Sequence, residues 1–321
     1  MSEELAIRTI DLRVDYGETV AVKSLNLEVP RGEIYGLVGP NGAGKTSTFR
    51  ILSTLMEPTY GEVFLCGIDA LLYPADVRHR LAYMPDLAPV PSDLRCGEFL
   101  EMFAAAHGLR GKEKRDRVEE CLEIAELTEK RNSMCRTLSR GMTQRLVLAK
   151  SLLHKPDVLI LDEPASGLDP VRRAGLRNAL RDIAKDGRTV IISSHILTEL
   201  ADMCTSVGLM RRGLLVDSGR VDDVVDRMGQ KQKRITIRFF EGLEGAKRFL
   251  DAKETASGVE IQPGGDALQF SFSGGNEQQS ELIAELIRNG CKLRTFQEQQ
   301  STIEEIFLEL SGDDEGGQEA E

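Results

Sequence analysis

The chain has 321 residues, of which 41% are hydrophobic, and a formal net charge of −11. This length allows one large domain or two ordinary ones, and the apolar content is sufficient for a hydrophobic core. The negative charge disfavours non-specific binding to nucleic acid, and no apolar run approaches the roughly 18 residues that a membrane span needs. The six cysteines are scattered without a C-x-x-C pair, which argues against a metal site or a disulfide framework and fits a reducing cytosol.

The N-terminal segment predicts two paired strands. Its first ten residues are acidic and lack the basic and apolar regions of a signal peptide, so we expect a cytoplasmic protein. Residues 5–14 and 20–29 then alternate apolar and polar side chains, as half-buried strands do, with Tyr16 and Gly17 making a turn between them. We expect these strands to form an antiparallel layer.

The strongest local signal has the form G-x-x-x-x-G-K-T, in the run Gly39-Pro40-Asn41-Gly42-Ala43-Gly44-Lys45-Thr46. It follows an apolar run at residues 33–38 and precedes helical apolar spacing at residues 46–56, so the order is strand, glycine loop, helix. Glycines let several backbone N–H groups converge on one anion at the positive end of a helix. Lys45 adds a full charge for terminal phosphates, and the Thr46 hydroxyl is a hard oxygen ligand suited to Mg²⁺. The alternative is a glycine turn with an accidental lysine, which this context disfavours.

The middle of the chain predicts a helical excursion from a sheet. Short strands are expected at residues 61–65 and 81–84, and the second is followed by Asp86, a carboxylate entering a loop. Residues 94–107 and 112–127 have amphipathic helical spacing with a glycine turn between them, so we expect a helical subdomain there.

A further helix opens within residues 137–145, where Ser139 is a good N-cap. Ser139 together with Gly141 can hold a phosphate at the positive end of that helix. Taken alone, however, the pattern is that of an ordinary capped helix.

Acidic residues follow the next predicted strand. The apolar run at residues 158–161 predicts a fully buried strand, and Asp162 and Glu163 come at its carboxyl end, where ligands collect in parallel sheets. Asp162 can hold Mg²⁺ or its waters, and Glu163 can polarise an attacking water. A second buried strand at residues 189–193 ends at His195, an imidazole that can contact a γ-phosphate.

The rest of the chain predicts a second domain. Residues 166–170 make a turn before a helix at 171–184, and a hairpin, a short helix at 221–228 and a polar linker at 229–233 follow. The elements expected after the linker are a strand at 234–240, a helix at 243–250, strands at 258–262 and 267–272, a helix at 277–288 and a strand at 291–296. This β-α-β-β-α-β order is ferredoxin-like, and a capping box predicts a last helix from Ser301.

Together these motifs resemble the ATP-binding subunit of an ABC (ATP-binding cassette) transporter over about residues 5–228. Matching segments are the Walker A loop (39–46), the family signature (138–145), the Walker B end (162–163), the D-loop (166–169) and the switch histidine, His195. The C-terminal domain resembles the accessory domain of ABC-2-type exporter ATPases, the group that contains drug and antibiotic efflux subunits.

The resemblance implies an α/β fold. It would be a P-loop NTPase ABC cassette with a mixed sheet core, an antiparallel β layer and a helical subdomain, followed by a C-terminal α+β ferredoxin-like domain. The implied boundaries are 1–229 for the cassette, with the helical subdomain at about 87–155, and 234–311 for the accessory domain. Residues 312–321 are an acidic tail that we expect to be disordered.

The resemblance also implies a homodimer that clamps two Mg-ATP molecules between its subunits. Catalysis would rest on Glu163, which activates water, on His195, which holds the γ-phosphate, and on Asp86. The implied Mg²⁺ ligands are Thr46, Asp162 and Asp86. The nucleotide would contact Tyr16 at the adenine-stacking position, then Gly39, Pro40, Asn41, Gly42, Ala43, Gly44, Lys45, Thr46 and Ser47 of one subunit, and Ser139 and Gly141 of the other.

Two motifs depart from the family pattern. The signature usually reads LSGGQ, whereas this chain has Arg140 and Met142 on either side of Gly141. The loop that usually carries a glutamine has Asp86, whose carboxylate adds repulsion near the triphosphate. We therefore expect weak basal hydrolysis that is stimulated by a bound membrane partner.

The implied function is to hydrolyse ATP and power a separate transmembrane permease, for export, from the inner face of the cell membrane. Nucleic acid is not an expected partner. The alternatives are a soluble ABC-type ATPase or regulatory factor not coupled to transport, and a sensor that binds ATP without turnover. A single cassette without sustained heptads disfavours the soluble factor, and Glu163 with His195 disfavours the sensor.

Overall fold

The computed structural model describes residues 4–86, 89–224, 227 and 233–300. The chain divides into two compact units, Met1–Val221 and Asp222–Glu321, which we describe separately. The predicted helix at 221–228 lies partly outside the described residues, and the predicted helix from Ser301 and the acidic tail lie wholly outside them.

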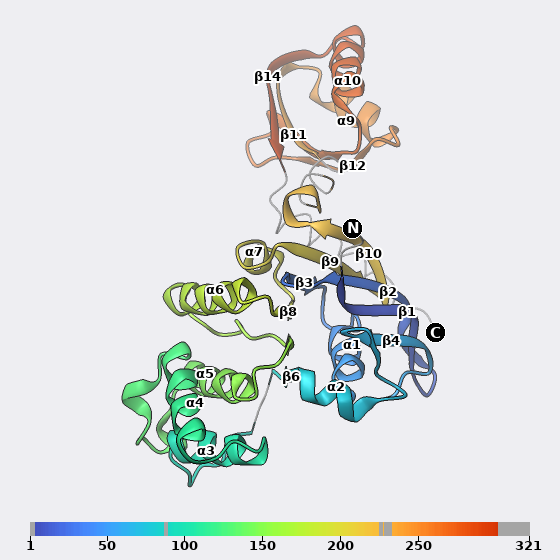
Figure 1. The fold of residues 1–321 in the computed structure, drawn as a ribbon. Coiled ribbons are helices and arrows are strands. Elements are labelled where there is room, and N and C mark those ends of the chain that lie inside the picture. The colour runs from blue at the N-terminus through green and yellow to red at the C-terminus, as the bar shows by residue number, and fades with distance from the viewer. Residues whose placement is uncertain (1–3, 87–88, 225–226, 228–232, 301–321) are drawn as a thin grey trace. The chain divides into compact units, whose positions relative to one another are not determined.

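The first unit is built on a ten-stranded sheet with the order β5-β4-β1-β2-β10-β9-β3-β8-β7-β6 (Figure 1). Its strands are β1 (Leu5–Tyr16), β2 (Thr19–Pro30), β3 (Ile34–Val38), β4 (Tyr60–Leu65), β5 (Ile68–Asp69), β6 (Leu81–Met84), β7 (Val158–Leu161), β8 (Thr189–Ser194), β9 (Ser206–Arg211) and β10 (Leu214–Arg220). Pairing is antiparallel among β5, β4, β1 and β2, and parallel among β9, β3, β8, β7 and β6. The predicted mixed core with an antiparallel layer is therefore confirmed.

The parallel and antiparallel halves of the sheet differ in how far their residues are buried. Every residue of β3, β7 and β8 is buried, as expected for parallel strands covered on both faces, whereas β1 and β2 alternate between buried and exposed. Helices α6 (Pro170–Lys185) and α7 (Leu197–Ala201) contact β3 and β8, and α1 (Lys45–Leu52) and α2 (Pro74–Arg80) contact other strands of the sheet. Because β3, β8 and β7 are adjacent and parallel, their carboxyl ends meet at one edge.

The helical subdomain consists of α3 (Cys96–Ala106), α4 (Gly111–Ile124) and α5 (Arg140–Leu152), with short 3₁₀ turns η1 (Thr128–Lys130) and η2 (Cys135–Thr137). Figure 1 shows these helices gathered at one end of the unit, away from β1, β2 and β4. The buried Arg117 of α4 donates to the backbone oxygens of Leu152 and Leu153 at the carboxyl end of α5. This satisfies carbonyls that the helix leaves unpaired, and α5 also packs on β6.

The second unit contains β11 (Lys233–Glu241), α9 (Leu243–Asp251), β12 (Ala256–Ile261), β13 (Ala267–Phe272), α10 (Asn276–Arg288) and β14 (Lys292–Gln300). Its four-stranded sheet has the order β12-β13-β11-β14 with every neighbour antiparallel. Ile235 and Ile237 of β11 pack with Leu250 of α9 and Leu286 of α10 in the core. The predicted ferredoxin-like order is confirmed, and no helix among the residues described in either unit combines the length and apolar character that crossing a membrane demands.

Candidate functional site

The glycine loop joins β3 to α1 in a conformation that residues with a side chain at the glycine positions could not adopt without strain or clashes. Gly42 and Gly44 have φ angles of 80° and 106°, in the left-handed region that favours glycine. A Cβ atom on Gly39 would lie 2.3 Å from the backbone oxygen of Met210, and one on Gly44 would lie 2.5 Å from that of Ala21. The loop therefore packs directly on neighbouring backbone, which fixes its curvature.

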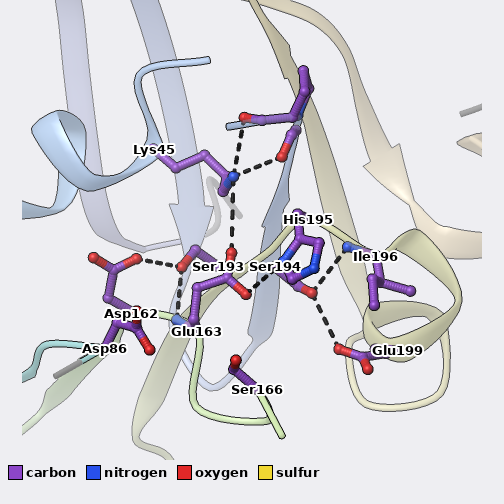
Figure 2. A network of polar contacts seen from close by, with 12 residues as sticks. Lys45, Asp86, Asp162, Glu163, Ser166, Ser193, Ser194, His195, Ile196 and Glu199 are labelled. Carbon is purple, nitrogen blue, oxygen red and sulfur yellow. Dashed lines mark hydrogen bonds and ion pairs between the residues drawn. The ribbon is translucent and has the colours of Figure 1, made fainter. Parts of the chain in front are cut away.

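Lys45 is the first residue of α1, and its side chain is only 6% exposed. Its Nζ donates to the backbone oxygens of Gly39 at 2.6 Å and Pro40 at 3.2 Å, and lies 3.8 Å from Glu163 Oε1 (Figure 2). Burial lowers the pKa of the Lys45 ammonium, and the nearby carboxylates of Glu163 and Asp162 partly oppose that shift. The loop thus holds this cation at its centre, where phosphate oxygens can take the place of the carbonyls.

Asp162 and Glu163 follow β7 and are both held by Ser193 of β8. The Ser193 hydroxyl donates to Asp162 Oδ1 at 2.6 Å and accepts from the Glu163 backbone N–H at 2.9 Å. Glu163 has a φ of 50°, which is uncommon for a residue with a side chain and costs free energy that the surroundings must supply. Figure 2 shows Ser193 between the two acids. Sequence patterns predicted no role for this serine, which was expected only as the end of a buried strand.

Glu163 lies between two basic side chains. One carboxylate oxygen is 3.8 Å from Lys45 Nζ, and the other is 3.0 Å from His195 Nδ1. Glu163 is 16% exposed and His195 is 47% exposed, so the carboxylate is largely covered while the imidazole faces solvent. The predicted pair of acid and histidine is therefore within hydrogen-bond distance at the edge formed by β7 and β8.

A cavity of about 530 Å³ brings most of the predicted residues together. Its volume falls in the range of small-molecule sites. It is lined by Asn41, Gly42, Ala43, Gly44, Lys45, Thr46, Ser47, Asp86, Asp162, Glu163 and His195, and also by Thr19, Val20, Ala21 and Ser166. The strand residues 19–21 and Ser166 were not predicted as lining residues. Residues 19–21 reach the cavity because β2 contacts α1 and the backbone oxygen of Ala21 lies close to Gly44, which are contacts between separate segments of the chain.

Oxygen donors in this cavity fit a small divalent cation. Thr46 offers a hydroxyl, and Asp162 and Asp86 offer carboxylates. Among the residues that the structure describes, no group of three or more His, Cys, Asp or Glu could hold a metal ion by itself. Mg²⁺ binds in proteins through one or two carboxylates together with water and substrate phosphates, and the oxygens of Thr46, Asp162 and Asp86 are of the kind it prefers.

Several predicted residues do not line the cavity. Ser139 caps α5 by accepting from the backbone N–H of Met142 at 3.4 Å, and Gly141 packs beside Leu168. The Tyr16 hydroxyl lies 3.3 Å from Ser47 Oγ, so the ring is near the loop but outside the lining set. Within one chain, the phosphate loop and the signature residues are thus separate.

Two of the residues that depart from the family pattern, Arg140 and Asp86, face each other. Arg140 Nη2 lies 3.9 Å from Asp86 Oδ1 and donates to Ser166 Oγ at 3.5 Å. Asp86 Oδ1 is a buried oxygen with no hydrogen-bond partner among the described residues. The negative charge that Asp86 adds to the cavity is therefore partly offset by a cation at the start of α5.

Comparisons with known proteins find relatives among ABC transporters. The family model for ABC transporters matches residues 22–166. The daunorubicin/doxorubicin resistance ATP-binding protein DrrA of Streptomyces peucetius is 33% identical over 319 residues, which cover 98% of this chain and 96% of that protein. The bacitracin transport ATP-binding protein BcrA of Enterococcus faecalis is 32% identical over 316 residues, or 97% of this chain and 98% of that protein. Among solved structures, the dimeric ABC transporter cassette MJ0796 aligns with a TM-score of 0.62 and 25% identity, over 67% of this chain and 98% of that one.

Proposed function

This chain belongs to the ABC transporter family, and on that premise we propose that it binds and hydrolyses ATP to power a separate membrane permease, for export. The observation that carries the proposal is the meeting of Lys45, Glu163 and His195 in one cavity with the glycine loop. A sensor without turnover would not need Glu163 and His195 in contact. A soluble factor is less consistent with DrrA and BcrA, whose names describe drug resistance and bacitracin transport.

The proposed chemistry is positioning and charge stabilisation at a phosphoryl group. Backbone N–H groups of residues 39–46 and the Lys45 ammonium bind the phosphates. Glu163 accepts a hydrogen bond from the attacking water, and His195 contacts the γ-phosphate. Mg²⁺, when bound, supplies positive charge to the phosphate oxygens, and Thr46, Asp162 and Asp86 are the residues that would hold it.

We further propose that a second copy completes each site. Ser139 and Gly141 lie outside the cavity of their own chain, and they belong to a capped helix start that is suited to phosphate. The relative MJ0796 is described as a dimer. In this arrangement Ser139 and Gly141 of one subunit cover the nucleotide on Lys45 of the other, and Tyr16 stacks on the base.

The proposed setting is the inner face of the cell membrane, where the subunit binds a permease encoded separately. The cassette would extend over residues 1–229 and the ferredoxin-like accessory domain over 234–311. Permease-stimulated hydrolysis is the expected behaviour, because Asp86 departs from the usual glutamine.

Glu163→Gln tests the mechanism. This change keeps the volume of the side chain but removes the charge that polarises water, so ATP should bind and hydrolysis should fall by about 100-fold or more. The variant should form an ATP-dependent dimer, measured by size-exclusion chromatography with light scattering. A variant that stays monomeric with saturating Mg-ATP contradicts the two-subunit site.

Co-purification tests the transport role. The tagged subunit, expressed together with a candidate permease, should be recovered in the membrane fraction with that permease. ATP turnover should rise in the complex relative to the isolated subunit. Recovery with ribosomes and no membrane protein would favour the soluble factor instead.

A further inference from the structure

Two consecutive serines at the end of β8 point to opposite sides of the strand, as successive side chains do. The Ser193 hydroxyl donates to Asp162 Oδ1 at 2.6 Å, on the side of the phosphate site. The Ser194 hydroxyl donates to Glu199 Oε2 at 3.2 Å, on the other side (Figure 2). The segment that carries His195 is therefore held from both sides of the strand.

Glu199 lies in the five-residue helix α7, and its buried carboxylate bonds to two elements. One oxygen accepts from Ser194, and the other lies 2.7 Å from Arg173 Nη2. The Ser194 hydroxyl also accepts from the backbone N–H of Ile196 at 3.0 Å. Because the residues on both sides of His195 share this hydroxyl, the position of Glu199 fixes the turn that presents the imidazole.

Arg173 extends the network to a second functional segment. It lies in the first turns of α6, and its Nη2 also donates to the backbone oxygen of Leu168 at 3.4 Å. Leu168 belongs to the turn at residues 166–169, and Ser166 of that turn lines the nucleotide cavity. A continuous path thus joins this turn to His195 through Arg173, Glu199 and Ser194.

We propose that Glu199 and Arg173 are a positioning pair that couples the turn at residues 166–169 to His195. Neither residue lines the nucleotide cavity, so the pair acts through the turn that it holds and not on the substrate. The inference builds on the proposed function, because it assigns a role for that turn in ATP hydrolysis. Movement of the turn when a second subunit docks would then shift His195 relative to Glu163.

The opposite charges of Glu199 and Arg173 stabilise the contact between them. A buried carboxylate is stable only when a cation and hydrogen-bond donors compensate for lost water. Glu199→Gln retains an oxygen that can accept from Ser194 but removes the attraction to Arg173. Arg173→Gln removes the cation and the donor to Leu168. Both single changes therefore break the ion pair between Glu199 and Arg173, and Arg173→Gln also breaks the contact with Leu168.

The first test is the position of the histidine, measured on the full chain without relying on turnover. The chain has four histidines, so ring resonances of ¹⁵N-labelled histidine can be assigned by single substitutions. Glu199→Gln and Arg173→Gln should both shift the ring resonances of His195 and leave those of His107 and His154 in place. Unchanged His195 resonances in both variants would overturn the proposal.

The second test is turnover. Glu199→Gln should lower kcat by about 10-fold or more, since displacement of a catalytic group by about 1 Å can cost 100-fold. The KM for ATP should change by less than about 2-fold, because the glycine loop is untouched. The double variant E199Q/R173Q should lose no more than the worse single variant, because both changes break one path. Glu199→Asp, which keeps the charge, should restore part of the lost rate.

Controls separate positioning from stability. Asp182→Asn breaks an exposed ion pair with Lys185 on the same helix, α6, and should leave both His195 and kcat unchanged. If Glu199→Gln lowers the melting temperature while the His195 resonances and the kcat per folded molecule stay the same, the pair is only structural and the proposal fails. Failure of the proposed function has a different signature, in which Glu163→Gln has no effect on turnover while the His195 shifts persist.

Discussion

The ion pair between Arg140 and Asp86 allows a quantitative prediction of nucleotide affinity. Removal of the cation by Arg140→Gln leaves the Asp86 charge in the phosphate cavity without its neighbour, so binding of Mg-ATP should weaken. Across the observed 3.9 Å, a unit-charge attraction is about 1 kcal/mol in water and about 4 kcal/mol at the effective dielectric constant of a protein surface.

Solvent exposure sets which value applies. The side chains of Arg140 and Asp86 are 61% and 44% exposed, so the interaction is screened and the lower value holds. A change of about 1 kcal/mol is about 5-fold in a dissociation constant. We expect Arg140→Gln to raise the Kd for Mg-ATP by about 3- to 5-fold.

Isothermal titration calorimetry with the four members of the double-mutant cycle checks this prediction. In the D86N background, Arg140→Gln should change the Kd by less than about 2-fold, and high salt should reduce every difference. The control Arg136→Gln removes the same charge from an exposed residue of η2 and should have little effect. If Arg140→Gln weakens binding equally with and without Asp86, the guanidinium acts on the nucleotide directly and the pairing is refuted.

Three further outcomes are expected. Lys45→Ala should weaken nucleotide binding by about 100-fold, because it removes charge-assisted hydrogen bonds of about 1.5–3 kcal/mol each; equal affinity in a fluorescent-nucleotide titration would contradict the role of the loop. Ser193→Ala should lower kcat, and it should lower the free energy of unfolding by about 1–3 kcal/mol, because Asp162 loses a buried donor; steady-state kinetics and urea denaturation measure the two effects. His107 and His154 stack at 4.2 Å between ring centroids, and burial lowers the pKa of both. Since the unfolded chain protonates them below about pH 6.5, the stability that they contribute is present above that pH and is lost as the pH falls through their folded-state pKa. A melting temperature whose pH dependence is unchanged in H107Q/H154Q would show that the stack is not responsible.

Local chain features predicted much of the fold. The glycine loop, the buried run before Asp162 and the β-α-β-β-α-β order of the second unit are each encoded within short segments by glycine positions or by apolar period. The cap at Ser139 was predictable for the same reason, because an N-cap needs only the next three residues.

Contacts between segments far apart in the chain could not be predicted from the sequence and were found only in the tertiary structure. Ser193 reaches Asp162 because β8 and β7 are neighbours in the sheet, and Glu199 reaches Arg173 because α7 and α6 both pack on β3 and β8. Likewise, Asp86 read alone predicts repulsion, whereas the fold places Arg140 against it. By itself, then, the sequence determined the elements and the phosphate-binding chemistry, because these depend on backbone geometry and on residue types close together in the chain. The tertiary structure decided which charges and hydroxyls meet, because those energies depend on distances that chain spacing does not set.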